Sequence, residues 1–135
     1  MAGYSGTPLP QKLGIKEQHK ICLLGAPRGF AELLGALPAG VTVATKLAKA
    51  PLDVIVFFTK DRAELVKRLA DLRARMQPAA GLWIAWPKKS SAVATDITED
   101  VIRAVALPTG LVDNKVCAID ATWSGLRLVI RRENR

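Results

Sequence analysis

Histidine is almost absent from this chain, which limits the chemistry that it could carry out. His19 is the only histidine among the 135 residues. It precedes the first strand that the sequence predicts, so we expect a surface histidine at the end of the sheet opposite any ligand crevice. Because this one histidine is expected away from the crevice, no Ser-His-Asp triad is predicted there, and without a second histidine neither a multi-histidine metal centre nor any other metal site is predicted.

Cysteine is also scarce, because Cys22 and Cys117 are the only two. Each lies within an apolar run, and no short spacing joins them, so they indicate neither a disulfide framework nor a zinc site. We interpret both as small buried hydrophobic residues, with a redox role as the alternative. This usage fits a reducing compartment, and we expect a cytoplasmic protein.

Long hydrophobic runs are missing. The longest strongly apolar stretch, Val54–Phe58, is far shorter than the roughly 20 residues that span a bilayer. The first residues show no basic segment followed by an apolar one, so no signal peptide is predicted. A soluble protein without membrane contact is therefore expected.

Positive charge, by contrast, is abundant. The formal net charge is +8, a balance that favours contact with phosphates, nucleic acid or anionic surfaces. The alternative is that the charge is spread over ordinary helix faces and serves solubility, since many of the basic residues have acidic neighbours.

Apolar runs that end in Gly- or Pro-containing turns predict strands, and apolar residues at helical spacing predict helices. Residues 1–19 form a polar lead-in with a short helix around Pro10–Leu13, and residues 20–135 are predicted to form one domain. The predicted strands are 20–25, 41–47, 53–59, 82–86, 112–119 and 126–131. The predicted helices are 28–37 and the segments after Asp61 and Asp96.

The two longer helices carry start signals. Asp61 with Glu64, and Asp96 with Glu99, have the spacing of a capping box. The helix after Asp61 has a buried stripe of Leu65, Leu69, Leu72 and Met76, and two expected surface ion pairs, Glu64–Arg68 and Asp71–Arg75.

The order of these elements resembles the Rossmann-like methyltransferase fold. That resemblance implies a three-layer α/β domain with a mostly parallel sheet of about six strands and a C-terminal antiparallel hairpin. One strand and its helices would be missing between Leu47 and Asp53, so the domain resembles a truncated class I methyltransferase core. In order of appearance, the strands are expected to lie second, first, third, fourth, sixth, fifth across the sheet.

Particular segments also resemble a widespread bacterial family of unknown function. They are GTPL at 6–9, KLGIK at 12–16, LGAP at 24–27, GLWIAWPKK at 81–89, LVDNKVCAID at 111–120 and TWSGL at 122–126. The resemblance covers almost the whole chain but implies no assigned activity.

In such a sheet, ligands bind beyond the carboxyl ends of the strands where the strand order reverses, here between Gly25 and Thr59. A nucleoside cofactor would need a flexible glycine turn and an acid after the second strand. The turn instead contains Pro27, and residues 43–46 include no acid, so no cofactor is predicted. The anion-binding candidates at this edge are Arg28, Thr59, Lys60, Lys88, Lys89 and Ser90.

Three tryptophans complete the candidate site. Trp83 and Trp86 are three apart in a strand and should face opposite sides of the sheet. Trp123 either plugs the end of the sheet or forms a surface contact. We expect a non-catalytic binding domain for a phosphorylated small molecule or a nucleic-acid backbone. The alternatives are a diverged S-adenosylmethionine-type enzyme and a protein–protein module that uses the terminal hairpin; the oligomeric state stays open.

Overall fold

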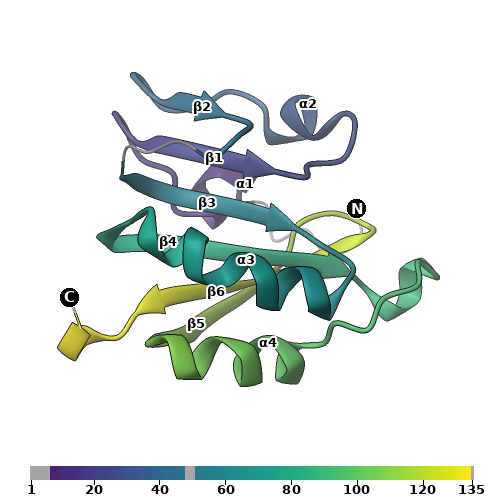
Figure 1. Cartoon of the computed structure of the whole chain (residues 1–135). Coiled ribbons are helices and arrows are strands. Elements are labelled where there is room, and N and C mark those ends of the chain that lie inside the picture. The colour runs from purple at the N-terminus through teal and green to yellow at the C-terminus, as the bar shows by residue number, and fades with distance from the viewer. Residues whose placement is uncertain (1–6, 48–50, 135) are drawn as a thin grey trace.

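One mixed sheet forms the centre of the molecule. The computed structural model describes residues 7–47 and 51–134, and its six strands lie in the order β2-β1-β3-β4-β6-β5 (Figure 1). The first four in this order are parallel, and β6 runs antiparallel to both β4 and β5. The Rossmann-like fold and the predicted strand order are both confirmed. The strands are β1 (Lys20–Leu24), β2 (Thr42–Ala44), β3 (Leu52–Phe58), β4 (Met76–Pro87), β5 (Leu111–Ala118) and β6 (Trp123–Ile130).

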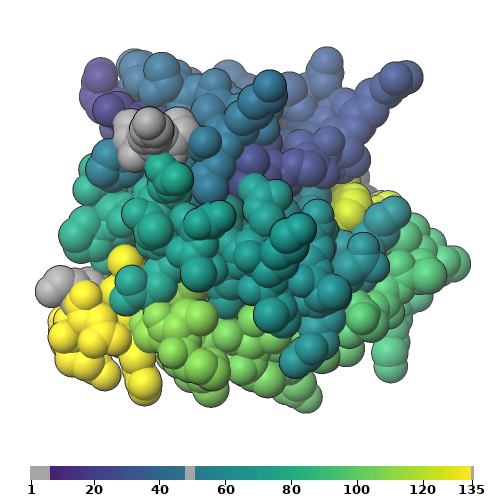
Figure 2. All heavy atoms as spheres, in the orientation of Figure 1, coloured from purple at the N-terminus to yellow at the C-terminus, as the bar shows by residue number. Residues whose placement is uncertain are grey.

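Helices cover both faces of the sheet and make three layers, and the teal and green side chains of α3 and α4 cover the face that is turned toward the viewer in Figure 2. Buried residues of α3 and α4 share one core cluster with one face of the sheet, and residues next to α1 and in α2 share the other. None of the helices within the described residues is long and apolar enough to cross a membrane. The helices are α1 (Leu9–Lys12), α2 (Phe30–Leu34), α3 (Arg62–Ala74) and α4 (Glu99–Ala106), with short 3-10 turns η1 (Lys89–Ser91), η2 (Leu107–Thr109) and η3 (Arg132–Asn134).

The strand β3 is buried on both sides, as its continuous apolar sequence predicts for a covered parallel sheet. Ile55 and Phe57 pack toward α3 and α4, whereas Val56 and Phe58 pack toward α1 and α2. The two strand tryptophans follow the same alternation, since Trp83 belongs to the second cluster and Trp86 to the first. Their placement on opposite faces is confirmed.

The lead-in segment contributes to the core. Leu13 is completely buried, and Ile15 is 5% exposed. The indole Nε1 of Trp83 donates a hydrogen bond to the Leu13 carbonyl, at 3.0 Å. The chain before β1 is thereby attached to the middle of the sheet. Whether 1–19 and 20–135 behave as separate units stays a prediction.

Two predicted elements are shorter than expected. The helix predicted over 28–37 is α2, and it ends at Leu34 because Gly35, with φ 76° and ψ −153°, leaves the helical region. The strand predicted over 41–47 is β2, which pairs only with Lys20–Cys22 of β1. The sequence predicts that one strand of the methyltransferase fold and its helices are missing between Leu47 and Asp53. Residues 48–50 of that interval lie outside the described residues.

The junction between α3 and β4 also differs from its prediction. The sequence predicts that Met76 belongs to the helix stripe, but α3 ends at Ala74 and Met76 pairs with Leu52 as the first residue of β4. The strand therefore begins well before Leu82. The ladder is interrupted before Gly81 pairs with Val54, next to Pro78, whose nitrogen has no hydrogen to donate.

The predicted helix start of α4 is wrong by two residues. Thr98 is the N-cap of α4, and its side chain accepts a hydrogen bond from the Val101 N–H. Glu99 is then the first helical residue and bonds to Arg103 instead of closing a capping box with Asp96.

The predicted ion pairs of α3, Glu64–Arg68 and Asp71–Arg75, are absent from the described residues. Glu64 accepts a hydrogen bond from Thr59. The guanidinium of Arg68 lies over the Phe57 ring, 5.6 Å from its centroid.

Candidate functional site

The carboxyl edge of the parallel strands brings the predicted site residues to one side of the molecule. Arg28 lies in the turn after β1, Thr59 and Lys60 follow β3, and Lys88–Ser90 follow β4. These strand ends lie at the right of Figure 1, next to the starts of α3 and α4. Arg28, Lys60, Lys89 and Ser90 are exposed, Lys88 is half-buried and Thr59 is buried.

The predicted crevice between β1 and β3 is closely packed. Gly25 has φ 67°, and a Cβ placed on it would lie 2.9 Å from the Phe58 carbonyl oxygen. Beyond it, Phe30 is 3% exposed and meets Phe58 edge-on, with ring centroids 4.9 Å apart. Phe30 and Phe58 therefore pack together beside this turn, on the face of the sheet that α1 and α2 cover.

Trp123 extends this aromatic cluster. Its ring meets Phe58 edge-on at 5.2 Å between centroids, and the side chain is half-buried. The carboxylate of Asp120 accepts hydrogen bonds from the N–H groups of Thr122 and Trp123, at 2.8 and 2.7 Å, which fixes the turn between β5 and β6. Trp123 packs as a side chain that closes the end of the sheet, and a surface-contact role for it stays a prediction.

Thr59 is the buried polar residue at the end of β3. Its hydroxyl donates a short hydrogen bond to the carboxylate of Glu64, one turn into α3. The same oxygen accepts a hydrogen bond from the Asp61 N–H at 3.3 Å. Thr59 thus shapes the entry into α3, and its hydroxyl is already engaged with an acid.

The start of α3 is also occupied by an acid, one that comes from a distant segment. The carboxylate of Asp96 accepts a hydrogen bond from the Arg62 N–H at 2.7 Å. Asp61 occupies the N-cap position but its side chain makes no capping bond. The Thr95 hydroxyl donates to the Lys60 carbonyl at 2.6 Å, which ties the two loops together. Both predicted capping boxes are therefore replaced by other bonds.

The segment after β4 is a compact turn. Lys88 donates its N–H to the Thr122 carbonyl at 2.8 Å, and the Ser91 hydroxyl donates to the Lys88 carbonyl at 2.6 Å. These bonds hold η1 against the turn between β5 and β6. The side chains of Lys89 and Ser90 stay exposed.

A cavity of about 570 Å³ lies between η1 and the start of α4. We call it the Trp86 cavity, because Trp86, which is 8% exposed, lines it together with Ile97, and its charged lining residues are Lys89 and Glu99. Lys89 is the only predicted candidate that lines it. Sequence reasoning missed Trp86 as a site residue, although its position as the last residue before Pro87 at a strand's carboxyl end was a usable signal.

The negative charge of Glu99 in this cavity is paired with a neighbouring cation. Arg103 bonds to Glu99 at 3.2 Å and to Asp113 at 3.0 Å. The hydrogen bond to Asp113 raises the pKa of the Arg103 guanidinium, so it stays charged. The pairing reduces the negative potential that Glu99 would otherwise direct at an anionic ligand.

His19 lies at the opposite edge, before β1, where the sequence placed it. It is half-buried and its Nδ1 accepts a hydrogen bond from the Lys16 N–H at 3.1 Å. A cavity of about 340 Å³ there is lined by His19, Asp53 and Arg127 among others. Among residues 7–47 and 51–134, no three His, Cys, Asp or Glu side chains are grouped so as to hold a metal ion.

Comparison with solved structures finds the same fold in methyltransferases. A SAM-dependent methyltransferase from Aquifex aeolicus superimposes with a TM-score of 0.64 at 15% identity, over 90% of this chain and 87% of that one. Magnesium protoporphyrin IX methyltransferase from Synechocystis, solved with bound SAM, gives 0.62 at 12% identity, over 91% and 74%. At these identities the likeness shows the fold alone.

Comparison with curated proteins finds no match. Comparison with protein families does find one, and it extends over β2 to β6, the strands that carry most of the carboxyl edge. The matching family is described as a protein of unknown function, DUF3052, and the match covers residues 40–132. Because this is more than half of the sequence, the chain belongs to the DUF3052 family.

Proposed function

We propose that this chain is a non-catalytic binding domain for a phosphorylated small molecule, held in the Trp86 cavity. The observation that carries the proposal is the combination of an indole wall and the Lys89 ammonium in one cavity at the carboxyl edge. Ligand pockets of roughly 300–1,000 Å³ with apolar walls and a few polar groups are typical of small-molecule sites. A ring of the ligand would pack on Trp86, and its phosphate would lie at Lys89.

The hydrogen bonds that the polar groups at this edge already make support a binding role without catalysis. Asp96 bonds to the start of α3, Glu64 bonds to Thr59, and the Thr95 hydroxyl bonds to a backbone carbonyl. Each of these groups is engaged in holding loops together. A general acid or base would instead need to reach a substrate proton.

The test compares ADP with adenosine by titration calorimetry. We expect ADP to bind and Lys89→Ala to weaken it about tenfold, since a hydrogen bond to a charged group contributes about 1.5–3 kcal/mol. Adenosine should bind weakly and equally to both proteins. Lys67→Ala is the matched control, because Lys67 is an exposed lysine on α3 that does not line the cavity. Equal ADP affinity in the Lys89 and Lys67 variants would refute the proposal.

A nucleic-acid backbone is the second candidate, and the net charge of +8 favours it. Binding to a short RNA or DNA would fall steeply as salt rises, because each phosphate contact releases counterions. If Lys88→Ala with Lys89→Ala left such binding intact, this candidate would fail.

A diverged S-adenosylmethionine enzyme is the third candidate and rests on the shared fold. Pro27 in the turn after β1 and the lack of an acid in residues 43–46 speak against it. Thermal stabilisation by S-adenosylmethionine that persists at high salt would favour this reading over the proposed one.

A further inference from the structure

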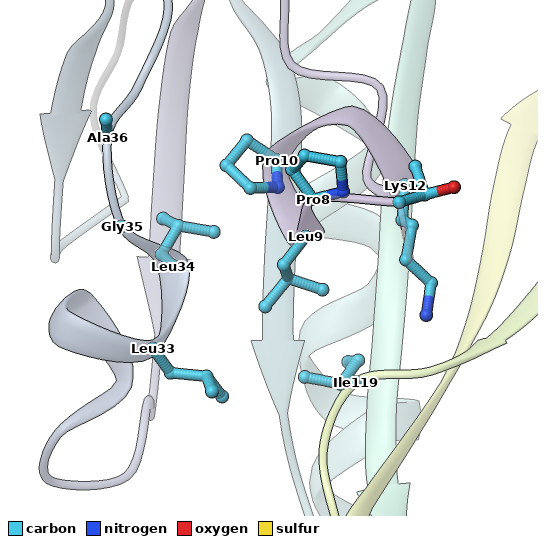
Figure 3. A pocket seen from close by; sticks show the side chains of 10 residues that line it. Pro8, Leu9, Pro10, Lys12, Leu33, Leu34, Gly35, Ala36 and Ile119 are labelled. Atoms are coloured by element: carbon cyan, nitrogen blue, oxygen red, sulfur yellow. The ribbon is translucent and has the colours of Figure 1, made fainter. Parts of the chain in front are cut away.

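A second cavity lies on the opposite face of the sheet, between α1 and α2. It has a volume of about 520 Å³, and we call it the α1–α2 cavity. Figure 3 shows that Leu9 from α1, Leu33 from α2 and Ile119 from the chain after β5 point toward the same space. Three separate elements thus contribute apolar walls to one cavity.

The walls of this cavity are anchored to the sheet. The Trp83 indole holds the end of α1 through the Leu13 carbonyl. Lys12 Nζ donates to the Ala118 carbonyl at 3.2 Å, and Phe30 fixes the start of α2 against Phe58. Each wall is thus attached to the sheet at a separate point.

Leu33 is the apolar side chain of α2 that lines this cavity and remains exposed to solvent. It is 36% exposed, whereas Phe30 and Leu34 of the same short helix are 3% and 4% exposed. A ligand in the cavity would remove apolar surface of Leu33 and its neighbours from water, which the hydrophobic effect favours.

Lys12 is the one charged residue among those that line the α1–α2 cavity. Its ammonium has three N–H donors, and one of them is used by Ala118. We propose that the α1–α2 cavity binds an amphipathic monoanion, with an apolar body between Leu9, Leu33 and Ile119 and a carboxylate at Lys12. This site is separate from the Trp86 cavity and does not depend on the function proposed for it.

The test is a titration of the ¹⁵N-labelled protein with octanoate and, in parallel, with 1-octanol, followed by amide NMR shifts. Octanoate is expected to shift the amide signals of Leu9, Leu33 and Ile119. Lys12→Gln keeps a donor for Ala118 but removes the charge, so octanoate affinity should fall about tenfold while octanol affinity stays the same.

A second variant tests the cavity itself. Leu33→Trp fills the space from a partly exposed position and should abolish the octanoate shifts. Leu107→Trp is the matched control, because Leu107 is 48% exposed outside this cavity. Absence of shifts at Leu9, Leu33 and Ile119 at millimolar octanoate, shifts confined to the Trp86 cavity, or unchanged octanoate affinity in Lys12→Gln would each overturn the proposal.

Discussion

The carboxylate of Asp96 accepts a hydrogen bond from the backbone N–H of Arg62 at 2.7 Å, although 34 residues separate them in the sequence. Arg62 is the first residue of α3, where the N–H groups have no partner within the helix. The cap of α3 therefore comes from the loop before α4. This one bond joins the start of α3 to the segment in which Thr95 and Ile97 line the Trp86 cavity.

Asp96→Ala is expected to lower the free energy of unfolding by about 1 kcal/mol, the usual loss when a capping side chain is removed. Asp96→Asn should recover most of it, because an amide oxygen also accepts the bond. Urea denaturation measures both. The control is Asp61→Ala, whose side chain makes no capping bond. A larger loss in the Asp61 variant than in the Asp96 variant would contradict this assignment.

The fold follows from local patterns that the tertiary structure reinforces. The continuous apolar run of β3 requires cover on both faces, and the alternation of Leu126, Leu128 and Ile130 indicates a strand with one core face. Those three side chains do lie in one core cluster. Such patterns depend on burial alone, so they predict the individual strands, whereas the order of the strands across the sheet is what the resemblance to the Rossmann-like methyltransferase fold implies.

Polar contacts over long sequence distances could not be predicted in this way. The spacing of Asp61 and Glu64 fits a capping box, but Glu64 finds a buried partner in Thr59, and Asp96 arrives from another loop. The Trp86 cavity could not be predicted from the sequence either, because Ile97 and Trp86 come together only through the packing of α4. Sequence spacing describes neighbours along the chain, and these bonds join neighbours in space.

Gly25→Ala is expected to destabilise the protein strongly. The residue has φ 67°, and a Cβ would lie 2.9 Å from the Phe58 carbonyl oxygen, so strain and collision add together. Gly14→Ala is the matched control: Gly14 has φ 81°, but a Cβ there meets nothing within 4 Å. We expect a loss of about 1 kcal/mol at Gly14 from backbone strain alone, and a clearly larger loss at Gly25. Thermal denaturation measures the loss of stability in both variants. Equal losses would mean that the Phe58 carbonyl moves aside at little cost in free energy.

The two thiols predict a loss of stability in alkaline solution. Burial raises the pKa of Cys22 and of Cys117 above the ordinary value near 9.0. In that range the unfolded chain releases its thiol protons while the folded chain keeps them, so rising pH favours unfolding. The contribution is fully present below the ordinary pKa and disappears as pH rises through the folded value.

The measurement is urea denaturation of the natural protein and of the Cys22→Ala, Cys117→Ala double variant, between about pH 7 and pH 10. The two proteins differ only at the two cysteines, so the difference between their curves reports the thiols. The stability of the natural protein should fall more steeply than that of the variant. Parallel curves would show that the folded thiols ionise as freely as unfolded ones.

The outer strand β5 is expected to resist pairing with a second copy, which bears on the protein–protein alternative. It lies at the sheet edge, and its ladder with β6 is irregular between Asp113 and Lys115. An edge bulge and an exposed lysine are two ways in which proteins prevent edge-to-edge association. Val116 is 52% exposed beside them. The strand β5 therefore offers apolar surface for pairing, but the bulge and Lys115 oppose that pairing.

Removal of the bulge and of the Lys115 charge should therefore cause self-association. Deletion of Asn114 together with Lys115→Val is expected to regularise the edge and produce a dimer that grows with protein concentration, measured by light scattering after size exclusion. Lys67→Val adds the same apolar residue to an exposed face of α3 and should leave the protein a monomer. If the natural chain is already a dimer, and Val116→Lys separates it, then β5 is an interface and the terminal hairpin is the contact that the protein–protein alternative requires.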